Sequence, residues 1–132
     1  DFTADGYRLP TEAEWEWAAR GGESYTYAGS NDVYDVAWYN TNGTRDVKTK
    51  KANAYGLYDM SGNVREWCWD WWCDSISSET PDTGSDSGSD RCYRGGSWYD
   101  YGEFSRVFIR RYSEYYYTRG TLCGFRVVCN AR

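Results

Sequence analysis

The sequence predicts an α+β domain with little regular secondary structure and many loops. Only one segment, residues 11–22, carries both a start signal and a stop signal for a helix. Short segments rich in aromatic and β-branched residues are typical of strands, and stretches of Gly, Ser, Asp and Asn separate them. A chain of 132 residues is long enough for one core of ordinary size. We therefore expect a single domain over residues 1–132.

The helix is predicted from its two ends. Thr11 is the expected N-cap, and Glu14, three residues later, completes a capping box. Arg20 lies near the negative end of the helix dipole, and Gly21 and Gly22 follow as the stop. The result is a short helix of about ten residues.

Most of the middle of the chain is predicted to be irregular. Residues 23–49 are polar, aromatic and turn-rich, with one short strand expected at residues 36–39. Residues 53–67 place two glycines and two asparagines around a short apolar strand, so tight turns are expected there. Residues 75–90 are predicted to form an exposed loop, whose Asp82, Asp86 and Asp90 do not have the spacing of an EF-hand calcium loop.

Two strands are predicted in the last third. Residues 91–98 have the pattern of a strand that runs into a close-packed glycine pair, and residues 124–129 have the apolar character of a buried strand. Residues 99–121, between them, follow neither the helical period nor the strand period. We expect irregular backbone there.

Composition excludes several classes of function. The chain contains no histidine, which excludes Ser-His-Asp and Cys-His catalysis and His-ligated iron or zinc. The net charge is −5, and the arginines of the last third are interleaved with Tyr rather than gathered in a Lys-rich stripe, so no nucleic-acid partner is expected. No run of about 18 apolar residues occurs, so no direct membrane insertion is expected.

Four motifs occur in a fixed order: YRLPTEAEWEWAARGG at 7–22, NAYGLYDMSGNVREW at 53–67, RGGSW at 94–98 and GFRVV at 124–128. In this order they resemble the formylglycine-generating-enzyme (sulfatase-modifying factor) family across nearly the whole chain. The resemblance implies the C-type lectin-like fold of that family, which is loop-rich α+β. The family domain normally has a sizeable part before the helix, so the chain is expected to be either a compact member or a C-terminal piece.

The resemblance does not extend to the family's catalytic residues. Its enzymes bind copper and oxidise a substrate cysteine with two cysteines shortly after the Gly-Gly-Ser sequence, and those positions fall on Asp100 and Ser105. Neither supplies a soft thiolate for copper(I). The related iron-dependent sulfoxide synthases need histidines. We therefore expect no enzyme and no copper; the alternative is a copper oxidoreductase that uses some other arrangement.

The resemblance also implies a structural calcium site. In the family the equivalent segment wraps calcium, and here it would use the carboxylates of Asp59 and Glu66 with the carbonyls of Gly62 and Val64. These hard oxygen ligands suit calcium. The alternative is that Asp59 caps a turn and Glu66 pairs with an arginine.

The five cysteines leave at least one without a partner in the chain. The fold implied by the resemblance would place Cys92 and Cys129 on neighbouring strands, which makes them the preferred disulfide in an oxidising compartment. Cys68 and Cys73 could close a local loop, leaving Cys123 over. Plain buried thiols are the alternative for each pair.

The region from about 93 to 121 is the predicted ligand-binding region. Tyr, Ser, Gly, Asp and Arg dominate it, as in antibody binding loops, and Tyr and Arg also dominate binding hot spots. The alternative is that the rings fill an aromatic core, since aromatic residues make up 20% of the chain. The candidate ligand-binding residues are Tyr93, Tyr99, Asp100, Tyr101, Phe104, Ser105, Ile109, Arg111, Tyr112, Ser113, Tyr115, Tyr116 and Tyr117.

The same region is similar to the variable region of proteins diversified by retroelements, which share this fold. Their mutagenesis replaces adenines in AAY codons, which can yield Tyr, Asp, Ser, Phe, Ile, Thr, Gly and Arg but not Glu, Lys, Trp or Gln. The irregular positions of residues 93–121 carry mostly the reachable set, so Glu103 and Glu114 should be fixed.

The expected function is therefore non-catalytic binding of a protein or cell-surface ligand. Such a display protein is expected at the cell surface or secreted, and to act as a monomer. A calcium-dependent carbohydrate-binding lectin is a lower-ranked alternative, because the usual carboxylate-and-amide cluster is not recognisable.

Overall fold

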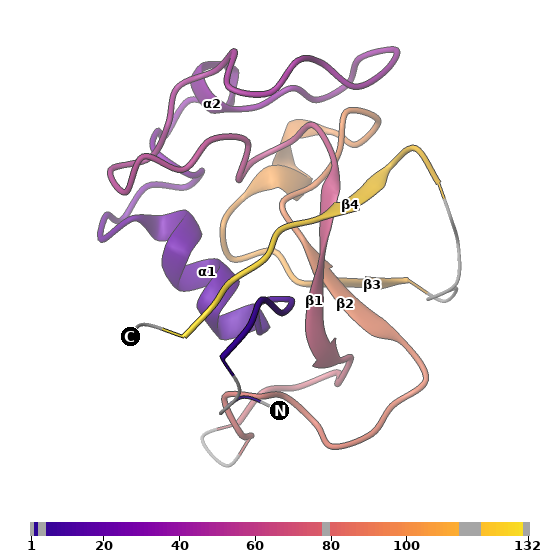
Figure 1. Ribbon diagram of the computed structural model, residues 1–132. Helices are drawn as coiled ribbons and strands as arrows, with labels where there is room; N and C mark the ends of the chain where they lie inside the picture. The colour runs from indigo at the N-terminus through magenta and orange to yellow at the C-terminus, as the bar shows by residue number, and fades with distance from the viewer. Residues whose placement is uncertain (1, 3–4, 78–79, 114–119, 131–132) are drawn as a thin grey trace.

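The computed structural model describes residues 2, 5–77, 80–113 and 120–130. Its helices are α1 (Glu12–Arg20), α2 (Val33–Val36) and the 3-10 helix η1 (Gly102–Ser105), and its strands are β1 (Arg65–Trp71), β2 (Arg91–Arg94), β3 (Arg111–Ser113) and β4 (Cys123–Phe125) (Figure 1). Turns and extended segments make up the rest of the described chain. The prediction of a loop-rich α+β fold is confirmed. Among the described residues, no helix combines the length and the apolar character needed to cross a bilayer.

The four strands form one sheet in the order β3-β2-β1-β4. β2 pairs antiparallel with both β1 and β3, whereas β4 pairs parallel with β1. Side chains alternate along β1, so that Glu66, Cys68 and Asp70 are buried while Trp67 and Trp69 lie on the other face. Helix α1 lies against the buried face of β1 and β2 (Figure 1). We call this the inner face and the opposite one the outer face.

Helix α1 begins and ends as its sequence predicts. The Thr11 side chain accepts from the Glu14 backbone N–H at 3.1 Å, and the Glu14 carboxylate accepts from the Thr11 N–H at 2.9 Å. Gly21 ends the helix in the left-handed conformation, with φ of +62°. The predicted capping box and glycine stop are confirmed.

The core lies between α1 and the inner face. Trp15 is its largest buried apolar residue, and Ala19, Met60, Cys68 and Val107 are also nearly inaccessible. The chain around them is compact enough that a Cβ on Gly95 would lie 3.1 Å from the Trp15 ring. Both the packing of Trp15 and the turn after β2 therefore require glycine at residue 95.

The strand predicted at residues 36–39 is wrong. The short helix α2 ends at Val36, and residues 37–39 belong to no strand. The physical reason is a local cap, because the Asp32 side chain accepts from the Tyr34 backbone N–H at 2.9 Å and starts a helical turn.

The buried strand predicted at residues 124–129 is only partly correct. Strand β4 ends at Phe125, which is 71% exposed, and Val127 is 47% exposed. Val128 makes an isolated bridge to Arg8 rather than continuing the ladder. β4 is an edge strand, so within the described chain only β1 pairs with it and its other side has no neighbouring strand.

Both predicted disulfides are wrong. All five cysteines are free thiols, and β1 lies between β2, which carries Cys92, and the β4 segment that leads to Cys129. Cys68 lies within β1 and Cys73 two residues beyond its end, and both are free thiols. The plain-thiol alternative describes Cys68 and Cys92, which are fully buried.

Candidate functional site

The loop that follows the glycine pair is fixed by one carboxylate. Asp100 accepts from the Ser97 backbone N–H and hydroxyl at 2.9 and 2.7 Å, and from Arg65 Nε and Nη2 at 2.9 and 2.5 Å. Burial by itself raises the pKa of Asp100, but the hydrogen bonds from Arg65 and Ser97 outweigh burial and hold it below its usual range. Asp100, one of the predicted ligand-binding residues, thus points inward and ties the loop to β1.

The two tyrosines that flank this carboxylate point outward. Tyr99 is 67% exposed and Tyr101 is 68% exposed. The ring of Trp98 packs edge-on against Tyr99 with centroids 5.8 Å apart, and its Nε1 donates to the Thr121 carbonyl at 3.0 Å. The loop therefore presents two large amphipathic rings on a backbone that hydrogen bonds hold in place.

Other predicted residues border this loop. Phe104 is half-buried, and the Arg111 guanidinium lies 4.8 Å above its ring. Tyr112 is 40% exposed and stacks on Trp72 with centroids 4.8 Å apart. Ser113 is the last residue of β3. These residues lie on or beside the edge strand β3.

The remaining predicted residues are less accessible. Tyr93 is 6% exposed on the outer face, where Arg65 and the ring of Trp67 pack against it. Ser105 is completely buried and Ile109 half-buried. For Tyr93 and Ser105 the alternative of a packing role agrees with their burial. The predicted Tyr115, Tyr116 and Tyr117 lie outside the described residues.

The segment predicted to bind calcium is already occupied by protein groups. The Asp59 carboxylate accepts from the Lys48 backbone N–H at 2.8 Å. The Glu66 carboxylate accepts hydrogen bonds from Trp15 Nε1 at 2.8 Å and from the Arg126 guanidinium at 2.8 and 3.0 Å. Both of its oxygens are therefore hydrogen-bonded. No cluster of three or more Cys, Asp or Glu suited to a metal occurs in the described part of the chain.

These contacts match the alternative, in which Glu66 pairs with an arginine. As placed, Glu66 does not fit a calcium ligand, because Arg126 already supplies the positive charge. Calcium binding at this segment stays a prediction of the family resemblance.

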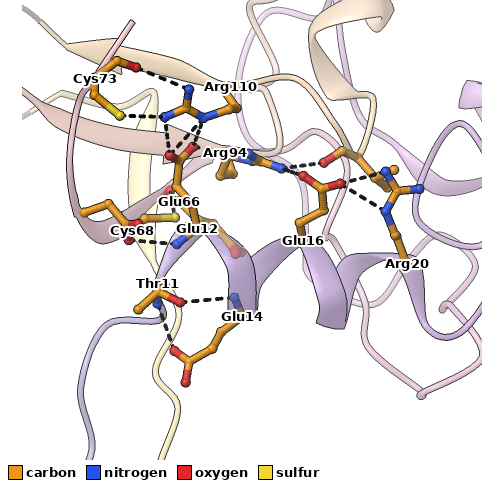
Figure 2. A network of polar contacts seen from close by, with 12 residues as sticks. Thr11, Glu12, Glu14, Glu16, Arg20, Glu66, Cys68, Cys73, Arg94 and Arg110 are labelled. Atoms are coloured by element: carbon orange, nitrogen blue, oxygen red, sulfur yellow. Dashed lines mark hydrogen bonds and ion pairs between the residues drawn. The ribbon is translucent and has the colours of Figure 1, made fainter. Parts of the chain in front are cut away.

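A buried ion network joins α1 to β2 and to the segment before β3 (Figure 2). Arg94, whose side chain is 1% exposed, donates to Glu12 at 3.1 Å, to the Val107 carbonyl at 2.8 Å and to Glu16. Arg110 donates to the two oxygens of Glu12 at 2.7–3.2 Å. Both arginines therefore converge on Glu12, which fixes the backbone that leads from η1 into β3.

Sequence reasoning missed this network. Glu12 and Glu16 are spaced by four residues on α1, so they share one helix face, but their partner Arg94 is 82 residues from Glu12. The available signal was an arginine next to a glycine pair, together with a helix face that carries two carboxylates. A hollow of about 430 Å³ lies beside the network, but its three arginines and two glutamates already bind one another.

Three of the five thiols are poorly suited to nucleophilic chemistry. Burial raises the pKa of Cys68 and of Cys92 well above that of a free thiol, and it also raises the pKa of Cys123. At neutral pH these three thiols are protonated, so none of them is a ready nucleophile.

The chain matches the model of one protein family and several known proteins. The model of the sulfatase-modifying factor enzyme 1-like domain matches residues 3–131. The chain is 44% identical over 118 residues to the chaperone protein LppX of Paenibacillus barcinonensis, and 39% identical over 117 residues to the formylglycine-generating enzyme of Thermomonospora curvata. These matches cover 72% and 70% of this chain and 39% of each relative.

Among solved structures, the variable protein 1 of Treponema denticola superposes with a TM-score of 0.91 at 44% identity. The superposition covers 98% of this chain and 49% of that one. The chain thus spans less than half the length of each of these three proteins.

Proposed function

Because the chain belongs to the family of sulfatase-modifying factor enzyme 1-like domains, we propose that it uses the family fold without the family chemistry, as a non-catalytic module that binds a protein or cell-surface ligand. The observation that carries the proposal is the close likeness to a variable protein, at a TM-score of 0.91 and 44% identity.

The binding surface is the loop that carries Tyr99 and Tyr101, together with the neighbouring edge strand β3. Burial of rigid rings provides contact area at a low cost in side-chain entropy, and nearby hydroxyls and guanidinium groups provide hydrogen bonds. The anchoring of Asp100 by Arg65 and Ser97 supports this proposal, since a loop held in place before binding loses less entropy when the ligand arrives.

The residues at the positions of the copper-binding thiols argue against catalysis. Asp100 has its carboxylate committed to Arg65 and Ser97, and Ser105 is completely buried. An oxidoreductase would need another pair of accessible thiolates, whereas burial holds Cys68 and Cys92 protonated.

Diversification by a retroelement is the finer part of the proposal. Tyr99, Tyr101, Phe104 and Tyr112 carry residues that an AAY codon reaches by adenine mutagenesis, and all four are at least partly accessible. Substitutions at exposed or half-buried side chains leave the ion network and the glycine turn untouched, so this surface tolerates sequence change. The protein would be displayed at the cell surface or secreted, and would bind as a monomer.

The test is to sequence the 3′ end of the gene and its flanks from many cells of one culture. We expect differences confined to codons such as those for Tyr99, Tyr101, Phe104, Ile109 and Tyr112, next to a near-copy template repeat and a reverse transcriptase gene. Uniform codons with neither of these would overturn diversification and leave a binding surface of constant sequence.

A further inference from the structure

The outer face of the sheet carries aromatic and cationic side chains that lie next to the proposed binding loop. Trp67 and Trp69 come from β1, Arg91 from β2, Arg111 from β3 and Phe125 from β4. Phe125 is 71% exposed, Trp69 is 39% exposed and Arg111 is exposed. The side chains that alternate with them along β1 and β2 bind α1 on the inner face. The outer face is thus accessible at three of its four strands.

The strand register aligns three of these side chains in one row with the buried Tyr93. Arg111 is paired with Tyr93, Tyr93 with Trp67, and Trp67 with Phe125. Paired residues of adjacent strands lie on the same face, about 4.8 Å apart, so the row extends about 14 Å across the sheet. A row of this length has a cation at one end and an exposed ring at the other.

Two arginines of this face have no carboxylate partner among the described residues. Arg111 lies over the Phe104 ring, and Arg91 lies 3.5 Å above the Trp71 ring and donates to the Trp69 carbonyl. By contrast, Arg65 is paired with Asp100. The inner arginines are paired as well: Arg94 and Arg110 with Glu12, and Arg126 with Glu66.

Stacking on rings restrains these two guanidinium groups. A restrained cation that is partly shielded from water binds a carboxylate more strongly than a mobile, fully hydrated one, because less entropy and less solvation are lost. Burial lowers the pKa of Arg91 by more than the negative charge of Asp70 raises it, and the guanidinium stays protonated at neutral pH.

We propose that this outer face binds a short acidic segment of a partner protein, with carboxylates at Arg91 and Arg111 and apolar side chains on Trp69 and Phe125. The inference rests on the proposed function, since it names the kind of partner for a surface that Arg111 joins to the binding loop through Phe104.

Charge favours a short acidic peptide over a nucleic acid. The whole chain carries a net charge of −5, so the positive charge of this face is local and comes from Arg91 and Arg111, whereas Arg94, Arg110 and Arg126 are paired with glutamates on the inner face. A nucleic acid has one negative charge per nucleotide and extends beyond the face, where the acidic remainder of the protein repels it. A short peptide meets only the local positive charge.

The experiment measures fluorescence anisotropy with a labelled ten-residue peptide of alternating Glu and Leu. A Lys-Leu peptide and a ten-residue oligothymidylate of matched length are the comparison probes. The proteins are the wild type, Arg111→Glu, Phe125→Ser and, as the matched control, Lys51→Glu, which reverses a charge at an exposed position beside α2. Circular dichroism melts establish that each variant is folded.

We expect the wild type to bind the Glu-Leu peptide and neither comparison probe. Arg111→Glu should weaken binding at least about tenfold and Phe125→Ser several-fold, while Lys51→Glu changes it less than about twofold. The proposal is overturned if the wild type does not bind the acidic peptide, if a folded Arg111→Glu binds it equally well, or if the oligothymidylate binds as tightly. Each result is independent of the gene-sequencing test, so the two proposals can fail separately.

Discussion

Arg65 and Asp100 form a two-point ion pair, with Nε and Nη2 of the arginine 2.9 and 2.5 Å from the carboxylate oxygens. The pair connects the start of β1 to the middle of the loop after β2. Because Asp100 lies between the exposed Tyr99 and Tyr101, the pair sets the position of both rings. The proposed binding surface therefore depends on a contact between residues 35 positions apart.

Asp100→Asn should destabilise the protein at neutral pH by about 2 kcal/mol, the usual size for charge-assisted hydrogen bonds in a mostly buried site. The pKa of Asp100 is lowered in the folded state. Its contribution is therefore fully present above the unfolded pKa of about 4 and is lost as pH falls through the lower folded value. Urea unfolding at pH 7 and pH 3 checks this.

The matched control is Asp46→Asn, which removes an exposed carboxylate. We expect Asp46→Asn to change the free energy of unfolding by less than about 0.5 kcal/mol. A difference between wild type and Asp100→Asn that stays constant from pH 7 to pH 3 would show that the ion pair does not account for the effect.

Glu12→Gln should cost about 3–5 kcal/mol of stability, because it leaves Arg94 and Arg110 buried or half-buried without their shared carboxylate. Glu23→Gln, at an exposed position just after α1, is the control. Urea unfolding again measures both. A loss below about 1 kcal/mol for Glu12→Gln would mean that Glu16 takes over the pairing of Arg94.

Gly96→Ala separates backbone strain from steric clash when compared with Gly56→Ala. Both glycines have positive φ, +71° and +75°, but a Cβ on Gly96 would lie 2.6 Å from Ser105 Oγ, whereas none of the surrounding atoms lies within 4 Å of a Cβ on Gly56. We expect a loss of about 1 kcal/mol for Gly56→Ala and about 3 kcal/mol for Gly96→Ala. Equal losses in thermal melts would show that the turn conformation alone requires glycine at residue 96.

Calcium should not change the melting temperature of the wild type, since Arg126 and Trp15 occupy the Glu66 carboxylate. The measurement is a pair of melts, one in millimolar calcium and one in excess chelator. A rise of several degrees in calcium that chelator reverses, and that Glu66→Gln abolishes, would establish the calcium site that the family resemblance predicts.

The candidate site was predictable in part. Tyr99 and Tyr101 belong to a segment whose composition indicates a binding loop, and both are exposed. Asp100 belongs to the same segment but points inward, because it forms an ion pair with Arg65 at the start of β1. Trp69 and Phe125 were missed as surface groups, since a tryptophan or phenylalanine within an apolar run is usually a core residue.

The sequence by itself determined the elements whose signals lie within a few residues. The capping box of Thr11 and Glu14 and the stop at Gly21 specify α1, because each of these contacts forms within one helical turn. The glycines at 95 and 96 specify the turn after β2 for a similar reason, since glycine has no Cβ and adopts positive φ without a steric penalty.

Only the tertiary structure decided which distant segments meet. The placement of β1 between β2 and β4 separates Cys92 from Cys129, and the edge position of β4 leaves Phe125 exposed. The pairing of Arg94 with Glu12 joins residues 82 positions apart. Such contacts depend on the packing of the whole chain, because the burial that makes a charge pair or an apolar side chain favourable is supplied by residues far away in the sequence.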